Sequence, residues 1–238
     1  MRTNFNCVTI VIGALIACSS SHCIAESSHL TPPAEPEFLS KEFKHEEWNC
    51  TGEVCELLVI HEGALALGEA KEVSIYAITN KVGSVLKMSN LGCAVMSLTM
   101  PDAAGVFENV VLEFEKPEDH VKDGQISTIC GRVANRISDG KFTLDGYEYN
   151  TTLNFGWAKK ATLHGGTFGF DKKKWHLLDK AKFPYNDNQL VFYYISPDGE
   201  EGFPGNLLTF AAYSLTDEQE LVVEFYAFSD KTTICNLT

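Results

Sequence analysis

One histidine in this sequence stands among residues that would let a ligand approach it. His164 follows Leu163 and precedes Gly165 and Gly166. Glycines beside a histidine remove side-chain bulk, so a ligand can contact both the imidazole and the backbone amides. The same pattern fits a turn whose glycines only satisfy backbone dihedral angles, with His164 as a capping or core residue. The residues alone leave both interpretations open.

A second candidate site pairs a carboxamide with a guanidinium. The segment from Gly131 to Ile137 places Asn135 and Arg136 side by side among apolar residues. Together the two groups can donate and accept several hydrogen bonds, which suits a neutral polyol such as a sugar. The alternative is a structural arginine that pairs with an acidic neighbour. The closeness of Arg132 to Arg136 does not decide between these interpretations.

The other residues that could carry chemistry favour structural roles. The run from Ser196 to Gly205 concentrates turn-forming residues and three carboxylates. It lacks the ligand alternation of an EF-hand calcium loop, so we predict a long solvated loop. No Gly-x-Ser-x-Gly elbow occurs in the chain, which argues against a serine hydrolase. His176 follows Trp175 and is predicted to lie in a strand.

The elements that position these residues are predicted to be strands. Short apolar or alternating runs, typical of strands, occupy residues 73–78, 95–100, 110–114, 190–195, 207–213 and 221–228. Residues 142–149 predict a hairpin, because Asp145-Gly146 stands between two alternating segments and glycine tolerates the positive φ of a tight turn. The sequence contains no persuasive long helical pattern. The pattern therefore predicts an all-β fold, most simply a sandwich.

Composition limits the class of protein and of partner. The 238 residues are 45% hydrophobic, which is ample for the core of one large domain. They carry 19 Lys and Arg against 32 Asp and Glu, a formal net charge of -13. Such a charge repels phosphate backbones and anionic lipid surfaces at long range, so we expect no nucleic-acid partner.

The N-terminal segment is typical of a secretory signal peptide. Arg2 precedes an apolar run, residues 8–18, and small residues follow up to Ala25. Roughly 11 apolar residues are too few to span a bilayer, which takes ~20. We predict a signal peptide over residues 1–25, a location outside the cell or in an endomembrane lumen, and no membrane attachment after cleavage. Three sequons agree with glycosylation on that route: Asn49, Asn150 and Asn236.

Two further regions follow the predicted leader. Residues 26–53 are rich in Pro, Ser and charge, so we predict a disordered extension there. We predict one domain over residues 54–238. Leader cleavage would leave five cysteines, an odd number: Cys50, Cys55, Cys93, Cys130 and Cys235. Cys50 and Cys55 could close a small disulfide loop, whereas a metal site lacks the Cys-x-x-Cys spacing and a matching second half.

Four motifs, in this order, make the chain resemble the aldose 1-epimerases, or galactose mutarotases, which interconvert the α and β anomers of free sugars. They are Gly-Arg-Val-Ala-Asn-Arg-Ile at 131–137, Leu-Asp-Gly-Tyr at 144–147, Leu-His-Gly-Gly-x-x-Gly-Phe-Asp-Lys at 163–172, and Ser-Pro-Asp-Gly-Glu-Glu-Gly-Phe-Pro-Gly at 196–205. The resemblance runs from about residue 70 to the end. It implies a large antiparallel β-sandwich of the galactose mutarotase type, no metal or nucleotide cofactor, and free glucose or galactose as partner.

The resemblance also implies residue roles. Asn135 and Arg136 match the family's residues that bind sugar hydroxyls, and His164 matches a histidine that contacts the sugar near its ring oxygen and supports catalysis. In the family mechanism a glutamate takes the proton of the anomeric hydroxyl and a second histidine protonates the ring oxygen. The ring opens, the C1–C2 bond rotates, and closure gives the other anomer. Each positioned acid or base can contribute ~10²–10⁴ in rate.

The family pattern places that second histidine in a Thr-Asn-His-x-Tyr-Phe motif after a segment like residues 231–238. The resemblance thus puts the general acid, a sugar-binding aspartate and the base glutamate beyond Thr238. We expect a C-terminally incomplete domain that is inactive as it stands. The alternatives are a secreted, non-catalytic carbohydrate-binding paralogue and a sandwich whose sugar site has decayed. The presence of Asn135, Arg136 and His164 argues against the last.

Overall fold

The computed structural model describes residues 8–16, 73–114, 126–181 and 185–238, and it consists almost entirely of antiparallel strands. The predicted all-β class is therefore confirmed. Within those ranges, no helix is long and apolar enough to cross a membrane. The predicted extension over residues 26–53, with Cys50, Cys55 and the Asn49 sequon, lies outside the described residues.

The larger sheet has five strands in the order β1-β13-β12-β11-β10. Their bounds are β1 Val8–Ile16, β10 His176–Leu177, β11 Gln189–Ser196, β12 Leu207–Leu215 and β13 Glu220–Ser229. The last three were predicted within two residues at either end, because long apolar runs of this length are a strong strand signal. The central strand β12 is buried at nearly every position, as expected for a strand covered on both faces.

The strand β1 pairs antiparallel with β13, from Val8 opposite Ala227 to Ile16 opposite Glu220. This segment falls inside the predicted signal peptide. The pairing does not test cleavage near Ala25, so the signal peptide stays a prediction.

The second sheet has four strands in chain order: β2 Ile75–Thr79, β3 Val85–Ser89, β4 Val95–Pro101 and β5 Phe107–Asn109. The strand predicted over residues 110–114 is wrong, since β5 ends at Asn109. The Asn109 carboxamide oxygen accepts the N–H of Leu98 at 3.0 Å and that of Val111 at 3.3 Å. The side chain thus takes the place of a strand partner, and the ladder ends there.

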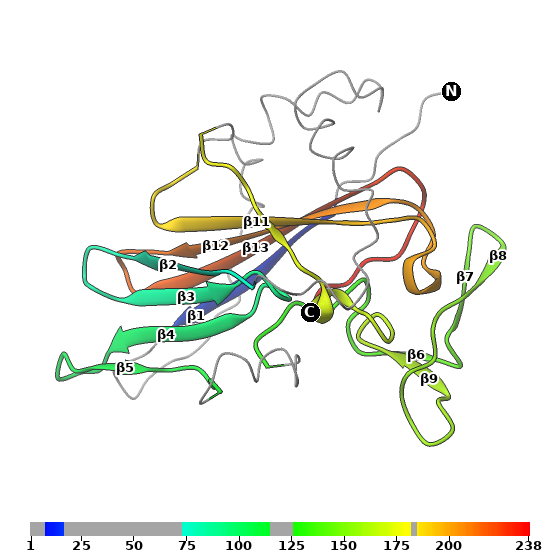
Figure 1. The fold of residues 1–238 in the computed structure, drawn as a ribbon, viewed down its shortest axis with the longest axis horizontal. Helices are drawn as coiled ribbons and strands as arrows, with labels where there is room; N and C mark the ends of the chain where they lie inside the picture. The colour runs from blue at the N-terminus through cyan, green and yellow to red at the C-terminus, as the bar shows by residue number, and fades with distance from the viewer. Residues whose placement is uncertain (1–7, 17–72, 115–125, 182–184) are drawn as a thin grey trace.

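The main core lies between the two sheets, which Figure 1 shows as stacked layers. Leu86 and Leu98 of the smaller sheet belong to one buried cluster with Phe192 and Tyr213 of the larger one. The ring of Tyr76 meets that of Phe192 edge to face at 5.6 Å. A second buried cluster lines the other face of the larger sheet. Burial of each such side chain contributes about 1.5–3 kcal/mol, which fixes the sheets as a rigid platform.

Two small two-stranded sheets lie beyond one end of the sandwich, on the right in Figure 1. They pair β6 Arg136–Ser138 with β9 Ala161–Leu163, and β7 Lys141–Leu144 with β8 Tyr147–Asn150. The β7–β8 pair is the predicted hairpin, with Asp145 at φ 50 and Gly146 at φ 81 as a tight turn requires. Two short 3-10 turns complete this end: η1 Phe170–Lys172 and η2 Glu200–Gly202.

Candidate functional site

The site is organised by a pair of residues at the end of the β6–β9 ladder. The last pair of the ladder is Arg136 opposite Leu163. Asn135 precedes β6 and His164 follows β9, so these two residues face each other one position beyond that pair. The backbone N–H of His164 donates to the Asn135 carbonyl at 3.0 Å. The backbone N–H of Asn135 donates to the imidazole Nδ1 of His164 at 3.1 Å. The fold thus brings together two predicted site residues that are 29 positions apart.

This geometry fixes the tautomer of the neutral imidazole. Because Nδ1 of His164 accepts the Asn135 N–H, it carries no proton, and a neutral ring then has its proton on Nε2. His164 is half-buried and has φ 50. It therefore presents Nε2–H as a fixed hydrogen-bond donor. The role of His164 beside a ligand stays a prediction, and the chemistry that this geometry offers for it is hydrogen-bond donation.

Arg136 is held beside the same pair. Its Nη1 donates to the Asn135 Oδ1 at 2.7 Å, and its guanidinium carbon lies 4.2 Å from the centre of the Phe155 ring. Both Asn135 and Arg136 are exposed, so the remaining N–H groups of the guanidinium fork are accessible to a ligand. The structure therefore groups all three predicted site residues, and it adds Phe155, which the sequence analysis missed.

The glycines are required by a close crossing of two motifs. A Cβ built on Gly165 would stand 1.6 Å from the carbonyl oxygen of Gly131, and Gly165 has φ +86. A Cβ on Gly131 would stand 2.2 Å from the Phe170 ring. The Phe170 N–H also donates to the Gly131 carbonyl at 3.1 Å. The turn that follows His164 thus packs backbone to backbone against the segment that leads to Asn135.

Arg132 is the structural arginine of the pair that the sequence left undecided. Its side chain is buried, with 1% of its surface exposed, and its partners are a hydroxyl and several carbonyl oxygens rather than an acidic neighbour. The guanidinium donates to Ser196 Oγ at 2.8 Å and to the carbonyls of Pro197, Pro204 and Gly205 at 2.7–2.8 Å. Arg132 therefore ties the segment before Asn135 to both sides of the β11–β12 connection.

The predicted solvated loop over residues 196–205 is confirmed only at positions 197–199, which are exposed, and is wrong at the two ends of the segment. Ser196 and Phe203 are fully buried, and Arg132 holds the ends of the segment. The Glu200 carboxylate accepts from the Tyr194 hydroxyl at 2.7 Å and lies 2.6 Å from the Lys173 ammonium. The turn formers let the chain reverse, and contacts with segments far away in the sequence bury the two ends of the reversal.

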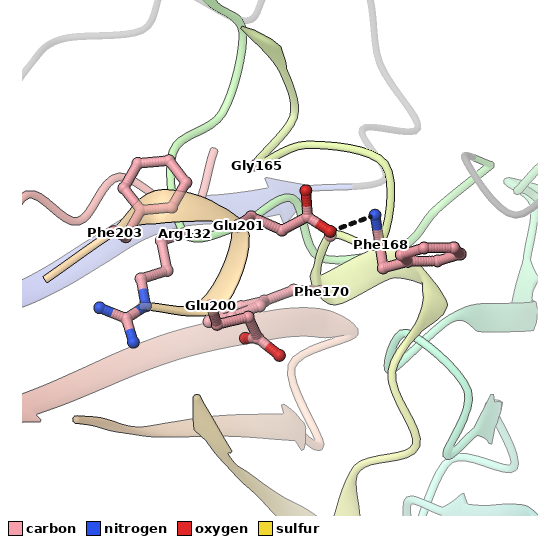
Figure 2. Close-up of a pocket in the computed structure, with 9 residues that line it drawn as sticks. Arg132, Gly165, Phe168, Phe170, Glu200, Glu201 and Phe203 are labelled. Atoms are coloured by element: carbon pink, nitrogen blue, oxygen red, sulfur yellow. Dashed lines mark hydrogen bonds between the residues drawn. The ribbon is translucent and has the colours of Figure 1, made fainter. Parts of the chain in front are cut away.

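Glu201, next in the chain, faces the loop that follows His164. Figure 2 shows its carboxylate directed at the backbone of Phe168, whereas Glu200 points away from it. The hollow in Figure 2 is lined by Arg132, Phe170, Glu200, Glu201 and neighbouring residues, and by none of Asn135, Arg136 and His164. The hollow therefore lies between the loop after His164 and the turn that carries Glu200 and Glu201.

One buried carboxyl lies beneath the loop. Asp171 is 2% exposed, and burial raises its pKa above the ordinary 3.8. Among the described residues neither carboxyl oxygen has a hydrogen-bond partner, although the Lys172 ammonium lies 3.3 Å from Oδ2. No group of three or more Cys, His, Asp and Glu side chains suited to a metal ion occurs within the described parts of the chain.

The other candidate residues of the sequence analysis are a histidine and three cysteines. His176 lies in β10, as predicted, and its ring stacks on Tyr193 at 5.2 Å. Cys93, Cys130 and Cys235 are free thiols, and burial raises the pKa of Cys235 to about 11. A thiol with so high a pKa is a weak nucleophile at neutral pH.

Comparison with known proteins shows the family of the chain. The family model described as aldose 1-epimerase matches residues 74–238. The chain is similar to the galactose mutarotase of Bos taurus, 42% identical over 148 residues, or 62% of this chain and 40% of the relative. It is 29% identical over 181 residues to the aldose 1-epimerase of Escherichia coli K12, or 76% of this chain and 50% of the relative.

A solved structure extends the similarity to the fold. The galactose 1-epimerase of Lactobacillus acidophilus superposes with a TM-score of 0.59 at 27% identity, covering 70% of this chain and 47% of that one. The predicted fold class, a large antiparallel β-sandwich, is confirmed. The chain spans half or less of the length of each of these proteins.

Proposed function

Because the chain belongs to the aldose 1-epimerase family, we propose that Asn135, Arg136 and His164 form the sugar-binding part of a site that interconverts the α and β anomers of a free hexose, such as glucose or galactose. The observation that carries the proposal is the hydrogen bond from the Asn135 N–H to Nδ1 of His164, at 3.1 Å. It leaves Nε2–H of His164 as a donor beside the exposed Asn135 amide and Arg136 fork.

The chemistry of anomer exchange gives this donor a use. When the base removes the proton of the anomeric hydroxyl, the electron pair of that O–H bond forms the C1 carbonyl and the C1–O5 bond breaks. The ring oxygen receives the electron pair of that bond and then a proton. A hydrogen bond from Nε2–H of His164 to the ring oxygen strengthens as the negative charge grows, so it stabilises the transition state more than the closed sugar.

The neighbouring groups suit the hydroxyls of the same sugar. Arg136 offers N–H donors in a fixed plane, and Asn135 offers amide donors beside an oxygen that already accepts from Arg136. Neutral polyols are bound by such sets of oriented donors and acceptors. Among the residues that the structure describes, we assign neither the general acid nor the general base. The proposed role of this part of the chain is binding and orientation.

We further propose that the protein enters the secretory route, which follows from the leader pattern of residues 1–25. The N-terminal sequence of the secreted protein tests this proposal. A mature protein that begins near residue 26 supports it. A mature protein that still begins at Met1 contradicts it.

The sugar site is tested by titrating the purified protein with galactose and with glucose, using glycerol as a control polyol. We expect saturable binding of the hexoses, a shift of the His164 imidazole signals, and at least a tenfold weaker affinity for Arg136→Ala. Glu218→Gln, an exposed charge change far along the chain, is the control and should bind normally. Equal affinity in wild type and Arg136→Ala would contradict the assignment.

Polarimetry on the same protein separates binding from turnover. Faster anomer exchange would show that an acid and a base both lie within this chain. Saturable binding without faster exchange would support the non-catalytic carbohydrate-binding alternative for the chain by itself.

A further inference from the structure

We propose that Glu201 is a positioning residue that holds the loop carrying His164 in its sugar-binding geometry. The galactose-binding measurement that tests this inference rests on the proposed function. The contacts of Glu201 that support the inference do not depend on it. Glu201 lies in η2, the connection between β11 and β12, 37 positions from His164 in the sequence. Its contacts with the loop are therefore tertiary and owe nothing to local chain geometry.

The carboxylate of Glu201 binds two successive backbone amides of the loop. Oε2 accepts the N–H of Thr167 at 3.1 Å, and Oε1 accepts the N–H of Phe168 at 2.9 Å. The second of these bonds is drawn in Figure 2. Hydrogen bonds from an N–H to a charged acceptor are stronger than those between neutral groups. One side chain therefore fixes the direction of the two N–H groups that lie three and four residues after His164.

The loop is shaped to lie against this carboxylate. A Cβ built on Gly166 would stand 2.2 Å from Oε2 of Glu201, and Gly166 has φ +112. Only glycine leaves room for the carboxylate at this distance and adopts this backbone conformation without strain. The second glycine after His164 is thus explained by Glu201 rather than by access for a ligand.

Glu201 is itself rigidly held. It has φ 50, a left-handed conformation that is uncommon outside glycine, and its carbonyl accepts the Thr152 N–H at 3.0 Å. Phe203, two residues later, is fully buried. Arg132 binds the carbonyls of Pro197 and Gly205 on either side of the turn. These contacts therefore hold the turn that carries Glu201, and the Glu201 carboxylate holds the loop that follows His164.

The loop is anchored on its other side by Asn154. Its Nδ2 donates to the carbonyl of Leu163 at 3.0 Å and to that of Gly166 at 2.6 Å. The His164 backbone lies between those two carbonyls, so Asn154 holds it from one side and Glu201 secures the chain that follows. Without Glu201, the peptide units after Gly166 lose their tertiary acceptors, and the orientation of the imidazole is less constrained.

The experiment compares Glu201→Ala, Glu201→Gln and the control Glu218→Gln in the full chain. Three quantities are measured: hydrogen exchange of the Thr167 and Phe168 amides, the imidazole nitrogen signals of His164, and the galactose dissociation constant. We expect Glu201→Ala to raise exchange at both amides by tenfold or more, to shift the His164 signals, and to weaken galactose binding about tenfold. Glu201→Gln keeps one acceptor oxygen and should fall between, with partial rescue. Glu218→Gln should match wild type.

The outcomes separate this inference from the proposed function. Unchanged amide exchange in Glu201→Gln, or faster exchange with unchanged His164 signals, would overturn the positioning role. If the wild-type protein binds no galactose, the proposed function fails. Glu201 is then judged on the His164 signals alone: a shift in both variants supports the positioning role, and no shift overturns it. If Glu201→Ala does not fold, the partial effect of Glu201→Gln decides.

Discussion

The imidazole Nδ1 of His164 accepts the backbone N–H of Asn135 at 3.1 Å, while the His164 N–H donates to the Asn135 carbonyl at 3.0 Å. This reciprocal pair extends the β6–β9 ladder by one step with a side chain in place of a backbone acceptor. Both residues have positive φ, 67 for Asn135 and 50 for His164. Such values cost free energy in most residues and persist because the surrounding contacts enforce them.

The first prediction separates the two nitrogens of His164. In His164→Asn the carboxamide oxygen can accept the Asn135 N–H in place of Nδ1, and asparagine tolerates positive φ well, but the donor at Nε2 is lost. We therefore expect a melting temperature within a few degrees of wild type and galactose affinity reduced at least tenfold. Thermal unfolding and calorimetry measure the two quantities. Unchanged affinity would show that His164 is not a sugar contact.

The second prediction contrasts two arginines four positions apart. Arg132→Met keeps an apolar stem of similar length but leaves the carbonyls of Pro197, Pro204 and Gly205 without their buried donor. We expect a loss of about 3 kcal/mol or more in the free energy of unfolding. Arg136→Met, at an exposed position stacked on Phe155, should cost no more than about 1 kcal/mol. Urea denaturation of both variants measures the contrast, and equal losses would contradict it.

The parts of the fold that the sequence predicted depend on local patterns. Asp145-Gly146 determines a tight turn within four residues, and β11, β12 and β13 are long apolar runs. The strand predicted at residues 110–114 failed because the decisive contact is tertiary. The Asn109 side chain binds Leu98, 11 positions away, and ends the ladder. No periodicity in the sequence carries that information.

The site divides in the same way. Asn135, Arg136 and His164 could be proposed from residue types and motif order, and the fold brings them together. The roles of Arg132 and Glu201 could not be predicted, since each acts across more than 30 positions. The turn-forming residues at 196–205 predict that the chain reverses direction there. They do not predict that Glu201 in this reversal binds the loop that follows His164.

The third prediction concerns the crossing of the two glycine motifs. Gly165→Ala would place a Cβ 1.6 Å from the carbonyl oxygen of Gly131, in addition to the strain of φ +86. We expect a loss above about 4 kcal/mol or a failure to fold. Gly146→Ala is the matched control: it has φ +81, and no described atom lies within 4 Å of its added Cβ. That variant should lose only about 1–2 kcal/mol from the backbone strain. Similar stability of the two variants would refute the crossing.

The fourth prediction is a pH dependence that Asp171 imposes on stability. Burial raises the pKa of this carboxyl above 3.8, so the folded state keeps its proton to higher pH than the unfolded state does. The stability that this group contributes is fully present below pH 3.8 and is lost as pH rises through the raised pKa. The Lys172 side chain, 38% exposed, is screened by water and offsets little of this loss.

Asp171→Asn removes that dependence while keeping the shape of the side chain. Relative to wild type, the variant should become more stable as pH rises from 4 to 7, by on the order of 1 kcal/mol at the upper end. Asp217→Asn should show the opposite sign. The hydrogen bond from Lys81 lowers the pKa of Asp217, so its stabilising contribution is present above pH 3.8 and is lost as pH falls. Urea midpoints of the three proteins from about pH 2.5 to pH 7 measure both signs, because the Asp217 contribution is lost only below pH 3.8. A wild-type advantage over Asp171→Asn that grows toward pH 7 would mean that Asp171 is ionised and well bound in the fold.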